Sequence, residues 1–437
     1  MGPTDVAIDE RVRVVPYTDL FRAPLGKSYH QGGPIWSDWP NAGFARHHTH
    51  GRRCDMPPPH QDPTAQLTDG NLFWGGAICH HFGHQIMDFS MRILGSCAAH
   101  PSASLLFSRL PGAPIPPFFK SILDWFEVEP ARVRVIDAPI RAQTLHIVPQ
   151  AEQTHRGTEP AGVVGPSAAY LDLMDRFIAQ KRLPLGTETR PVFLTRAGVQ
   201  LPLAGEAYIA WAAQQCGAIV VRPEQLPLAE QMALILAART LIITEGSAFH
   251  LLSLAGRQFH TLDVLVRRPS QQTANAALTP RCNALAYVDL LDGCLCGLTP
   301  KGRPFEHGGL PIPGERQVIE RFGRHGVDLR RVWSHDDFAD AVERDVRLWV
   351  RHRLRRAVTS HPDAAAFVDA TIDRALAVRP RLAAHVRAAV RNAAASLDTA
   401  PIQLPALRPT HSATLRRAIT RRLAPTRPRY PAPARVR

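Results

Sequence analysis

Hydrophobic and polar positions alternate along the middle of the chain in a pattern that predicts short buried strands separated by helices. Short apolar or β-branched runs occupy residues 105–107, 133–136 and 145–148. Between and after them, in residues 118–126 and 170–177, apolar positions recur three or four apart, which is helical spacing. Short apolar strands that alternate with helices favour a parallel sheet covered on both faces.

The same alternation restarts after residues 183–187, where Pro and Gly interrupt the pattern. The expected strands of this second region are residues 192–194, 219–221, 241–244, 261–266 and 286–290. The expected helices are residues 206–216, 228–238 and 247–254, and Gly217 is the expected C-cap of the first. The pattern predicts an α/β fold of two tandem Rossmann-like, doubly wound domains, hinged near residue 185 around a ligand cleft.

The two ends of the chain have a different character. The first 68 residues are rich in Pro, Gly and His and predict an irregular extension with one or two strands near residues 12–15. Residues 336–357 and 364–395 predict amphipathic helices with Arg on the polar face. The expected organisation is therefore an N-terminal extension (1–68), an acceptor-side α/β domain (69–184), a donor-side α/β domain (185–304), a helical extension (305–400) and an Arg/Pro-rich disordered tail (401–437).

The length and charge of the chain set limits on its function. A chain of 437 residues exceeds what one hydrophobic core usually organises. The net charge of +14 would suit nucleic acid or an anionic membrane, yet only four of the 52 basic residues are Lys, and an Arg-rich bias of this kind also follows from a GC-rich genome. No helix-turn-helix signature or basic platform with interleaved aromatics accompanies the tail, so nucleic-acid binding is a minor alternative.

The cysteines and apolar runs predict a compartment. Seven Cys without the spacing of a small disulfide scaffold favour a reducing environment. The sequence shows no signal-peptide pattern, and its longest apolar run, residues 232–243, is interrupted by Arg239. We expect a cytoplasmic protein with peripheral association at the inner face of the membrane through its basic tail.

A first cluster of candidate functional residues lies in residues 73–88. Gly75 and Gly76 precede a polar cluster and allow close approach of the backbone to a ligand. His84 and Asp88 lie four apart where the spacing is helical, so they share a face. A carboxylate beside an imidazole orients it and raises its basicity, which suits a general base.

Two alternatives stay open for this cluster. It is also compatible with an ordinary helix start that carries a capping histidine. A zinc site made of Cys79, His80, His81 and His84 is less favoured, because adjacent histidines on a helix point in divergent directions.

A second cluster follows the strand expected at residues 241–244. Gly246 and Ser247 stand where a strand ends and a helix begins, a junction whose free N–H groups and dipole bind anions, and His250 lies one turn further on. Arg196, at the end of the strand expected at residues 192–194, has the forked donors that suit a diphosphate. The alternative is an ordinary Ser-capped helix. A serine-hydrolase elbow is excluded, because Phe249 stands where that motif requires a glycine.

The order of these motifs resembles that of the family 61 glycosyltransferases. The matching residues run from Gly75-Gly76 through His81-Phe82-Gly83-His84, Asp88 and Arg92 to Leu194-Thr195-Arg196, Glu206, Gly217, Pro223-Glu224, Leu228-Ala229-Glu230-Gln231 and Glu245-Gly246-Ser247-Ala248-Phe249-His250-Leu251. They cover about residues 70–265. Departures are Gln85, where relatives usually have an aromatic or apolar residue, and Asp88, where they often have Glu.

The resemblance implies the two-domain GT-B fold and transfer of a sugar from a nucleotide-sugar donor to a glycan or glycolipid acceptor with inversion, often in capsule or other surface-polysaccharide synthesis. It implies His84 and Asp88 as catalytic residues and a donor site of Arg196, Glu245, Gly246, Ser247 and His250. We expect no cofactor and no metal, because the chain lacks an Asp-x-Asp triplet to hold a divalent ion. A non-catalytic sugar-binding or scaffold protein with the same fold is the main alternative.

Overall fold

The structure of the protein, a computed structural model, describes residues 2–17, 30–36, 38–39, 41–56, 66–199, 201–257 and 259–395. The chain groups into two compact units, Met1–Ala393 and Ala394–Arg437. The second unit lies almost wholly outside the described residues, as does the predicted disordered tail, so the description concerns the first unit.

The first sheet is mixed, whereas the sequence predicts a purely parallel one. In the order in which they pair, its strands are β3 (Gly33–Ile35), β1 (Ala7–Val15), β10 (Ile140–Ile147), β7 (Gln66–Ala77), β8 (Ser104–Ser108) and β9 (Val133–Ile136). The last four run parallel, and β1 pairs antiparallel with both β10 and β3. The N-terminal segment thus supplies two strands of the sheet: β1, which includes the strand predicted near residues 12–15, and β3.

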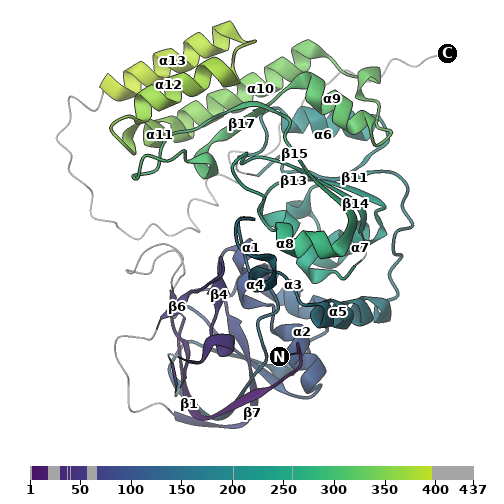
Figure 1. Ribbon diagram of the computed structural model, residues 1–437, viewed down its shortest axis with the longest axis vertical. Helices are drawn as coiled ribbons and strands as arrows, with labels where there is room; N and C mark the ends of the chain where they lie inside the picture. The colour runs from purple at the N-terminus through teal and green to yellow at the C-terminus, as the bar shows by residue number, and fades with distance from the viewer. Residues whose placement is uncertain are drawn as a thin grey trace. The chain divides into compact units, whose positions relative to one another are not determined.

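The second sheet is wholly parallel and follows the predicted strands closely (Figure 1). Its order is β12 (Ile219–Val221), β11 (Val192–Leu194), β13 (Thr240–Thr244), β14 (Phe259–Leu265) and β15 (Cys282–Val288). The chain enters at β11, adds β12 on one side and then continues with β13 on the other. The order therefore reverses between β11 and β13, and ligands of open parallel sheets bind at such a switch point.

Helices pack against the two sheets and share their core. The predicted helices appear as α3 (Pro117–Trp125), α5 (Ala168–Gln180), α6 (Glu206–Gln215) and α7 (Leu228–Ala237), with α2 (Ile93–Ala99), α4 (Ala161–Val164) and α8 (Asn275–Leu278) beside them. One cluster of buried apolar side chains runs from Phe107 and Met87 to Met232 and Leu251, across both sheets. The fold is therefore mixed α/β, with one main core cluster that both sheets share and smaller separate clusters beside the first sheet. The domain boundary expected near residue 185 stays a prediction.

The helices predicted in the C-terminal part of the chain are present, but their bounds differ from the prediction. After a hairpin of β16 (Leu291–Leu295) and β17 (Leu310–Pro313), the helices are α9 (Glu315–Gly323), α10 (His335–Trp349), the π-turn η9 (Val350–Leu354), α11 (Arg355–Thr359), α12 (Ala364–Ala375) and α13 (Pro380–Ala395). The helix predicted over residues 364–395 breaks before Pro380, because proline can begin a helix but cannot continue one. α10 contacts α6, and α12 contacts β16.

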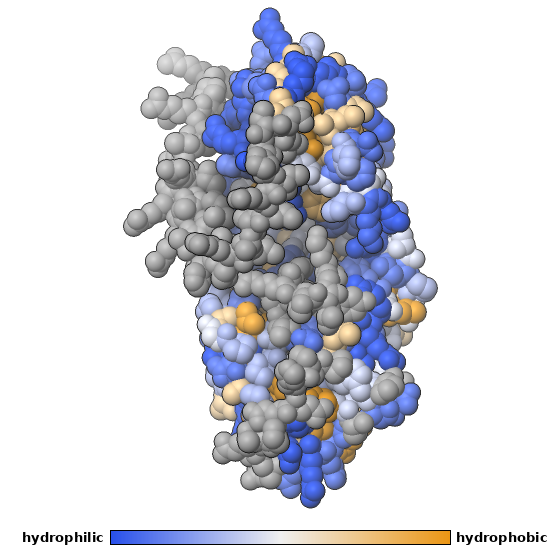
Figure 2. Space-filling model, turned by 90° about the vertical axis from the view of Figure 1, so that its left-hand side faces the viewer, coloured by the Kyte–Doolittle hydropathy of each residue, from blue (hydrophilic) through white to orange (hydrophobic). Residues whose placement is uncertain are grey.

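The surface of the described residues is mostly hydrophilic on the face shown in Figure 2, where hydrophobic residues form small, separate patches. None of the helices in the described part of the chain combines the length and the hydrophobicity that crossing a lipid bilayer requires.

Candidate functional site

The histidine–aspartate pair predicted from its spacing is present at the end of β7. His84 ends the short helix α1 (Phe82–His84), and Asp88 lies in the π-turn η2 (Gln85–Phe89). His84 Nδ1 lies 2.6 Å from Asp88 Oδ2. The capping histidine of this helix is His81, whose ring accepts from the His84 N–H. His81 therefore caps the helix, whereas His84 pairs with Asp88.

Asp88 is buried and accepts hydrogen bonds on both carboxylate oxygens. Oδ1 accepts from the Thr154 N–H at 2.8 Å, and Oδ2 accepts from Thr49 Oγ1 at 3.2 Å as well as from His84. An acceptor-only carboxylate assigns the imidazole proton to Nδ1, which leaves the lone pair on Nε2. The His84 side chain is 15% exposed, so part of it is accessible to solvent.

The glycines before this pair support it by close packing. Gly76 has a φ of +131°, and a Cβ there would overlap the Phe89 carbonyl, which ends η2. Gln85 turns inward: its Oε1 accepts from the Cys79 N–H at 2.7 Å, and its Nε2 donates to Ser90 Oγ at 3.0 Å. The departure at Gln85 from the family pattern thus stabilises the turn instead of entering the site.

Arg92 stabilises the segment that carries Thr49. Its guanidinium donates to the carbonyls of Val148, Phe44 and Arg46. Complete burial lowers the pKa of Arg92 to about 10. Arg92 is therefore a buried residue that connects the end of β10 to the N-terminal segment, not a ligand-binding residue.

The donor-side residues lie at the switch point of the parallel sheet. Arg196 follows β11, and Gly246 follows β13, its neighbour in the sheet. A Cβ on Gly246 would overlap the Arg196 guanidinium, so the end of the Arg196 side chain lies against the Gly246 backbone. Buried Glu206 links the two strand ends by accepting from the Arg196 N–H at 2.6 Å and from Thr244 Oγ1 at 2.7 Å.

Two further arginines, Arg267 and Arg268, follow β14 and join this edge. Glu245 Oε2 accepts from both of their backbone N–H groups, at 2.9 and 3.0 Å. Glu245 Oε1 accepts from Arg268 Nε at 2.8 Å and from Nη2 at 2.5 Å. Since the Glu245 side chain is completely buried and its oxygens are occupied, it fits a residue that positions Arg268 better than one that contacts a donor directly.

The arginines perturb one another and their neighbours. Burial, followed by the charges of Arg196 and Arg268, lowers the pKa of Arg267 to about 10. Burial together with Arg268 lowers the pKa of His307 to about 4, so His307 is neutral near pH 7 and its Nδ1 accepts from Arg268 Nη1 at 3.1 Å. Guanidinium groups that depress the pKa of neighbouring cations would be stabilised by an anion.

The two clusters meet through Gly83 and His250. A Cβ on Gly83 would lie 2.7 Å from His250 Cδ2 and 3.5 Å from Ser247 Cβ. His250 is buried, and burial, followed by the charges of His84 and His81, holds its pKa well below the usual value. The structure thus brings together His84, Asp88, Ser247 and His250, which lie on segments far apart in the sequence.

The helix that begins at Ser247 differs from the prediction. Residues Ser247–Leu254 form a 3-10 helix, η5, whose N-cap is Gly246, so Ser247 is the first residue of the helix and does not occupy the N-cap position. The tighter turn places residues three apart on one face, so His250 lies directly above Ser247. The side chain of Ser247 is therefore not committed to capping this helix.

The residues weighed as zinc ligands do not gather around one point. His80 Nε2 lies 2.9 Å from the Pro114 carbonyl, whereas Cys79 is buried beneath the turn. Across the described ranges, no group of three or more His, Cys, Asp or Glu side chains could hold a metal ion.

Sequence reasoning missed several residues of this site. Arg267 and Arg268 carried a usable signal, since they directly follow a predicted buried strand, as Arg196 does. Thr49 and Thr154 carried none, because Thr49 lies in the two-residue strand β4 (His48–Thr49) and Thr154 in an irregular segment, and both reach Asp88 only in the folded chain.

No protein-family model matches the chain, and no curated protein is significantly similar to it in sequence. The resemblance to family 61 glycosyltransferases therefore rests on the motifs alone.

Proposed function

We propose that the protein is a glycosyltransferase that moves a sugar from a nucleotide-sugar donor to a hydroxyl group of a glycan or glycolipid, with inversion. The observation that carries the proposal is the position of Arg196, Arg267 and Arg268 at one edge of a parallel sheet, joined through His250 to the His84–Asp88 pair. An anion-binding edge beside a base is what displacement of a nucleoside diphosphate requires. The GT-B arrangement belongs to the same proposal, supported by the all-parallel second sheet and its switch point.

In this mechanism the three arginines and the start of η5 bind the donor diphosphate and stabilise its charge as it leaves. His84 Nε2 takes the proton of the acceptor hydroxyl while the hydroxyl oxygen attacks the anomeric carbon. The bond from that carbon to the diphosphate breaks, and the diphosphate departs with its electron pair. Asp88 orients His84 and stabilises the imidazolium that forms. Alignment of the two substrates supplies much of the rate enhancement.

The first experiment is a thermal-shift screen of the whole chain against nucleoside diphosphates and nucleotide sugars, because a ligand that binds the folded state raises the melting temperature. Hits then enter an assay for release of the nucleoside diphosphate, with and without acceptor glycans. A stabilising nucleotide that is turned over supports the proposal. Binding without turnover indicates the non-catalytic alternative, and no binding by any nucleotide contradicts the donor site.

A further inference from the structure

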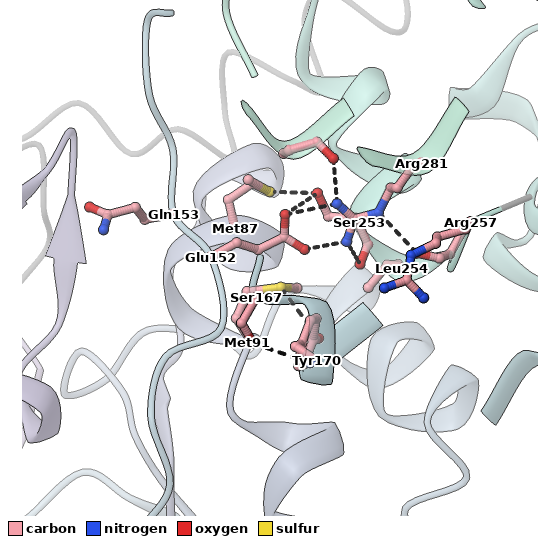
Figure 3. Close-up of polar contacts among 12 residues, drawn as sticks. Met87, Met91, Glu152, Gln153, Ser167, Tyr170, Ser253, Leu254, Arg257 and Arg281 are labelled. Carbon is pink, nitrogen blue, oxygen red and sulfur yellow. Dashed lines mark hydrogen bonds and ion pairs between the residues drawn. The ribbon is translucent and has the colours of Figure 1, made fainter. Parts of the chain in front are cut away.

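A completely buried ion pair connects the segments that carry the two parts of the site. Arg281 Nη2 lies 2.6 Å from Glu152 Oε1, and Nη1 lies 3.2 Å from Oε2, with both side chains 0% exposed (Figure 3). Glu152 follows β10 of the first sheet. Arg281 ends η6 (Thr279–Arg281), directly before β15 of the second sheet. The pair thus joins a segment that follows a strand of the first sheet to a segment that precedes a strand of the second.

Arg281 fixes the end of the helix that contains His250. Its Nε donates to the Ala255 carbonyl at 3.0 Å, directly after η5, and its Nη1 donates to the Ala277 carbonyl at 2.5 Å. The guanidinium therefore holds the last residues of η5, the helix α8 and Glu152 in one arrangement.

On the other side, Glu152 and its neighbours reach the His84–Asp88 pair by two routes. Ser253 Oγ lies 3.4 Å from Glu152 Oε2 and 2.9 Å from the sulfur of Met87, the residue before Asp88 (Figure 3). Thr154, two residues after Glu152, donates its N–H to Asp88 Oδ1. A shift of Glu152 would move both η2 and η5.

Stability alone does not explain this pair. Two buried charges lose their hydration, and replacing such a pair with apolar side chains of similar volume is often neutral or stabilising. Desolvation does raise the pKa of Glu152, even though Arg281 opposes this. What a forked, two-bond contact provides beyond apolar packing is a fixed register between the segments that it joins.

We propose that Glu152 and Arg281 are a positioning pair that sets the register of η2, which carries Asp88, against η5, which carries His250. Its catalytic consequence, alignment of the base with the donor, rests on the proposed glycosyl transfer. Neither residue touches a substrate in this account.

The test compares three forms of the full chain: the wild type, the apolar double variant Glu152→Leu/Arg281→Met, and Asp263→Asn. The last is a matched control, because Asp263 is a buried carboxylate that pairs with Arg321 and His325 of α9 and the turn after it, away from η2 and η5. The double variant avoids leaving one buried charge uncompensated, which would favour unfolding.

The primary measurement is hydrogen exchange by mass spectrometry on peptides that cover residues 82–89 and 247–254. We expect exchange in both segments of the double variant to rise together by about tenfold or more, as local opening becomes easier, while peptides from the sheets keep their protection. The control should change exchange only near β14 and α9. Unchanged exchange in either segment of the folded double variant overturns the proposal, whether or not the wild type transfers sugar.

The second measurement separates positioning from binding. With a donor identified, kcat of the double variant should fall by about 10- to 100-fold, because small misplacements of reacting groups have such effects. The dissociation constant for the nucleoside diphosphate should hold, because the arginines that bind it are untouched. Raised exchange with an unchanged kcat overturns the alignment role. A wild type without transferase activity refutes the proposed function. The role of the pair in setting the register of η2 and η5 is then tested by the hydrogen-exchange measurement alone.

Discussion

The balance of buried charge differs between the two sheets at the edges that form the site. Beside the first, mixed sheet, the single carboxylate of Asp88 accepts from His84, Thr49 and Thr154, so its charge is balanced and directed at one imidazole. Beside the second, parallel sheet, Glu245 is saturated by Arg267 and Arg268, and a third guanidinium, Arg196, adds to the positive charge.

The difference indicates a division of work. A balanced histidine–carboxylate pair suits the movement of a proton, whereas a surplus of desolvated guanidinium groups suits the binding of an anion. The substitutions that follow test whether the two regions are separable in this way, from the largest expected effect to the smallest.

The largest effect is expected on turnover, from the first region. His84→Ala should lower kcat by about 10²–10⁴-fold, the usual range for loss of a general base. The dissociation constant for the nucleoside diphosphate, measured by calorimetry, should hardly change. Asp88→Asn should cause a smaller loss of kcat, because the base remains and only its orienting charge is gone.

One outcome would contradict the catalytic role assigned to the first region. If His84→Ala lowers the melting temperature yet leaves kcat per folded molecule near normal, His84 serves packing at the helix start.

The second region should show the reverse behaviour. Arg196→Ala should weaken binding of the nucleoside diphosphate by about 10- to 100-fold, since a desolvated, charge-assisted contact contributes about 1.5–3 kcal/mol. Arg190→Ala is the matched control, because Arg190 precedes the same strand, β11, at its opposite end and pairs with Glu188 on the surface. Equal dissociation constants for the two variants would remove Arg196 from the donor site.

A further substitution tests how a carboxyl group with a raised pKa affects stability. Asp345 has one hydrogen bond from the Gly205 N–H, at 2.8 Å, and burial raises its pKa from 3.8 to about 6. The folded state therefore holds a proton between about pH 4 and 6 that the unfolded state has lost, so the free energy of unfolding falls as the pH rises through this window.

Asp345→Asn keeps the shape of the side chain and removes the charge. Chemical denaturation should show the variant more stable than the wild type at pH 7.5, by on the order of 1–3 kcal/mol, with the difference vanishing near pH 4. A variant that is less stable at pH 7.5 would show that the Asp345 charge is compensated, as that of Asp88 is.

The smallest effect on diphosphate binding is expected at His307, at the edge of the cluster formed by Arg196, Arg267 and Arg268. Neutral His307 accepts one hydrogen bond from Arg268, and such a bond contributes about 0.5–1.5 kcal/mol, so His307→Ala should weaken diphosphate binding about 2- to 10-fold by calorimetry. An effect as large as that of Arg196→Ala would place His307 on the ligand instead of behind Arg268.

The parts of this architecture that were predictable from sequence are those in which the signal is local. All five strands of the second sheet and the contact between His84 and Asp88 follow from hydrophobic runs and a spacing of four. The partner of β1 was not predictable, because alternation at Val12 and Val14 indicates a strand without naming its neighbour. The buried pair of Glu152 and Arg281 was hidden for the same reason, since neither residue carries a local pattern.

The pairing of β1 with β10 also constrains how the chain folds during its synthesis. Ala7 pairs with Ile147, and β1 lies inside the sheet, between β10 and β3. The ribosome adds about 5–20 residues per second, so several seconds pass between the synthesis of β1 and that of its main partner, β10. Closing so long a loop is entropically costly and slows folding. β1 is therefore incorporated long after it is synthesised, and the first sheet is completed only when the chain has grown well past residue 147.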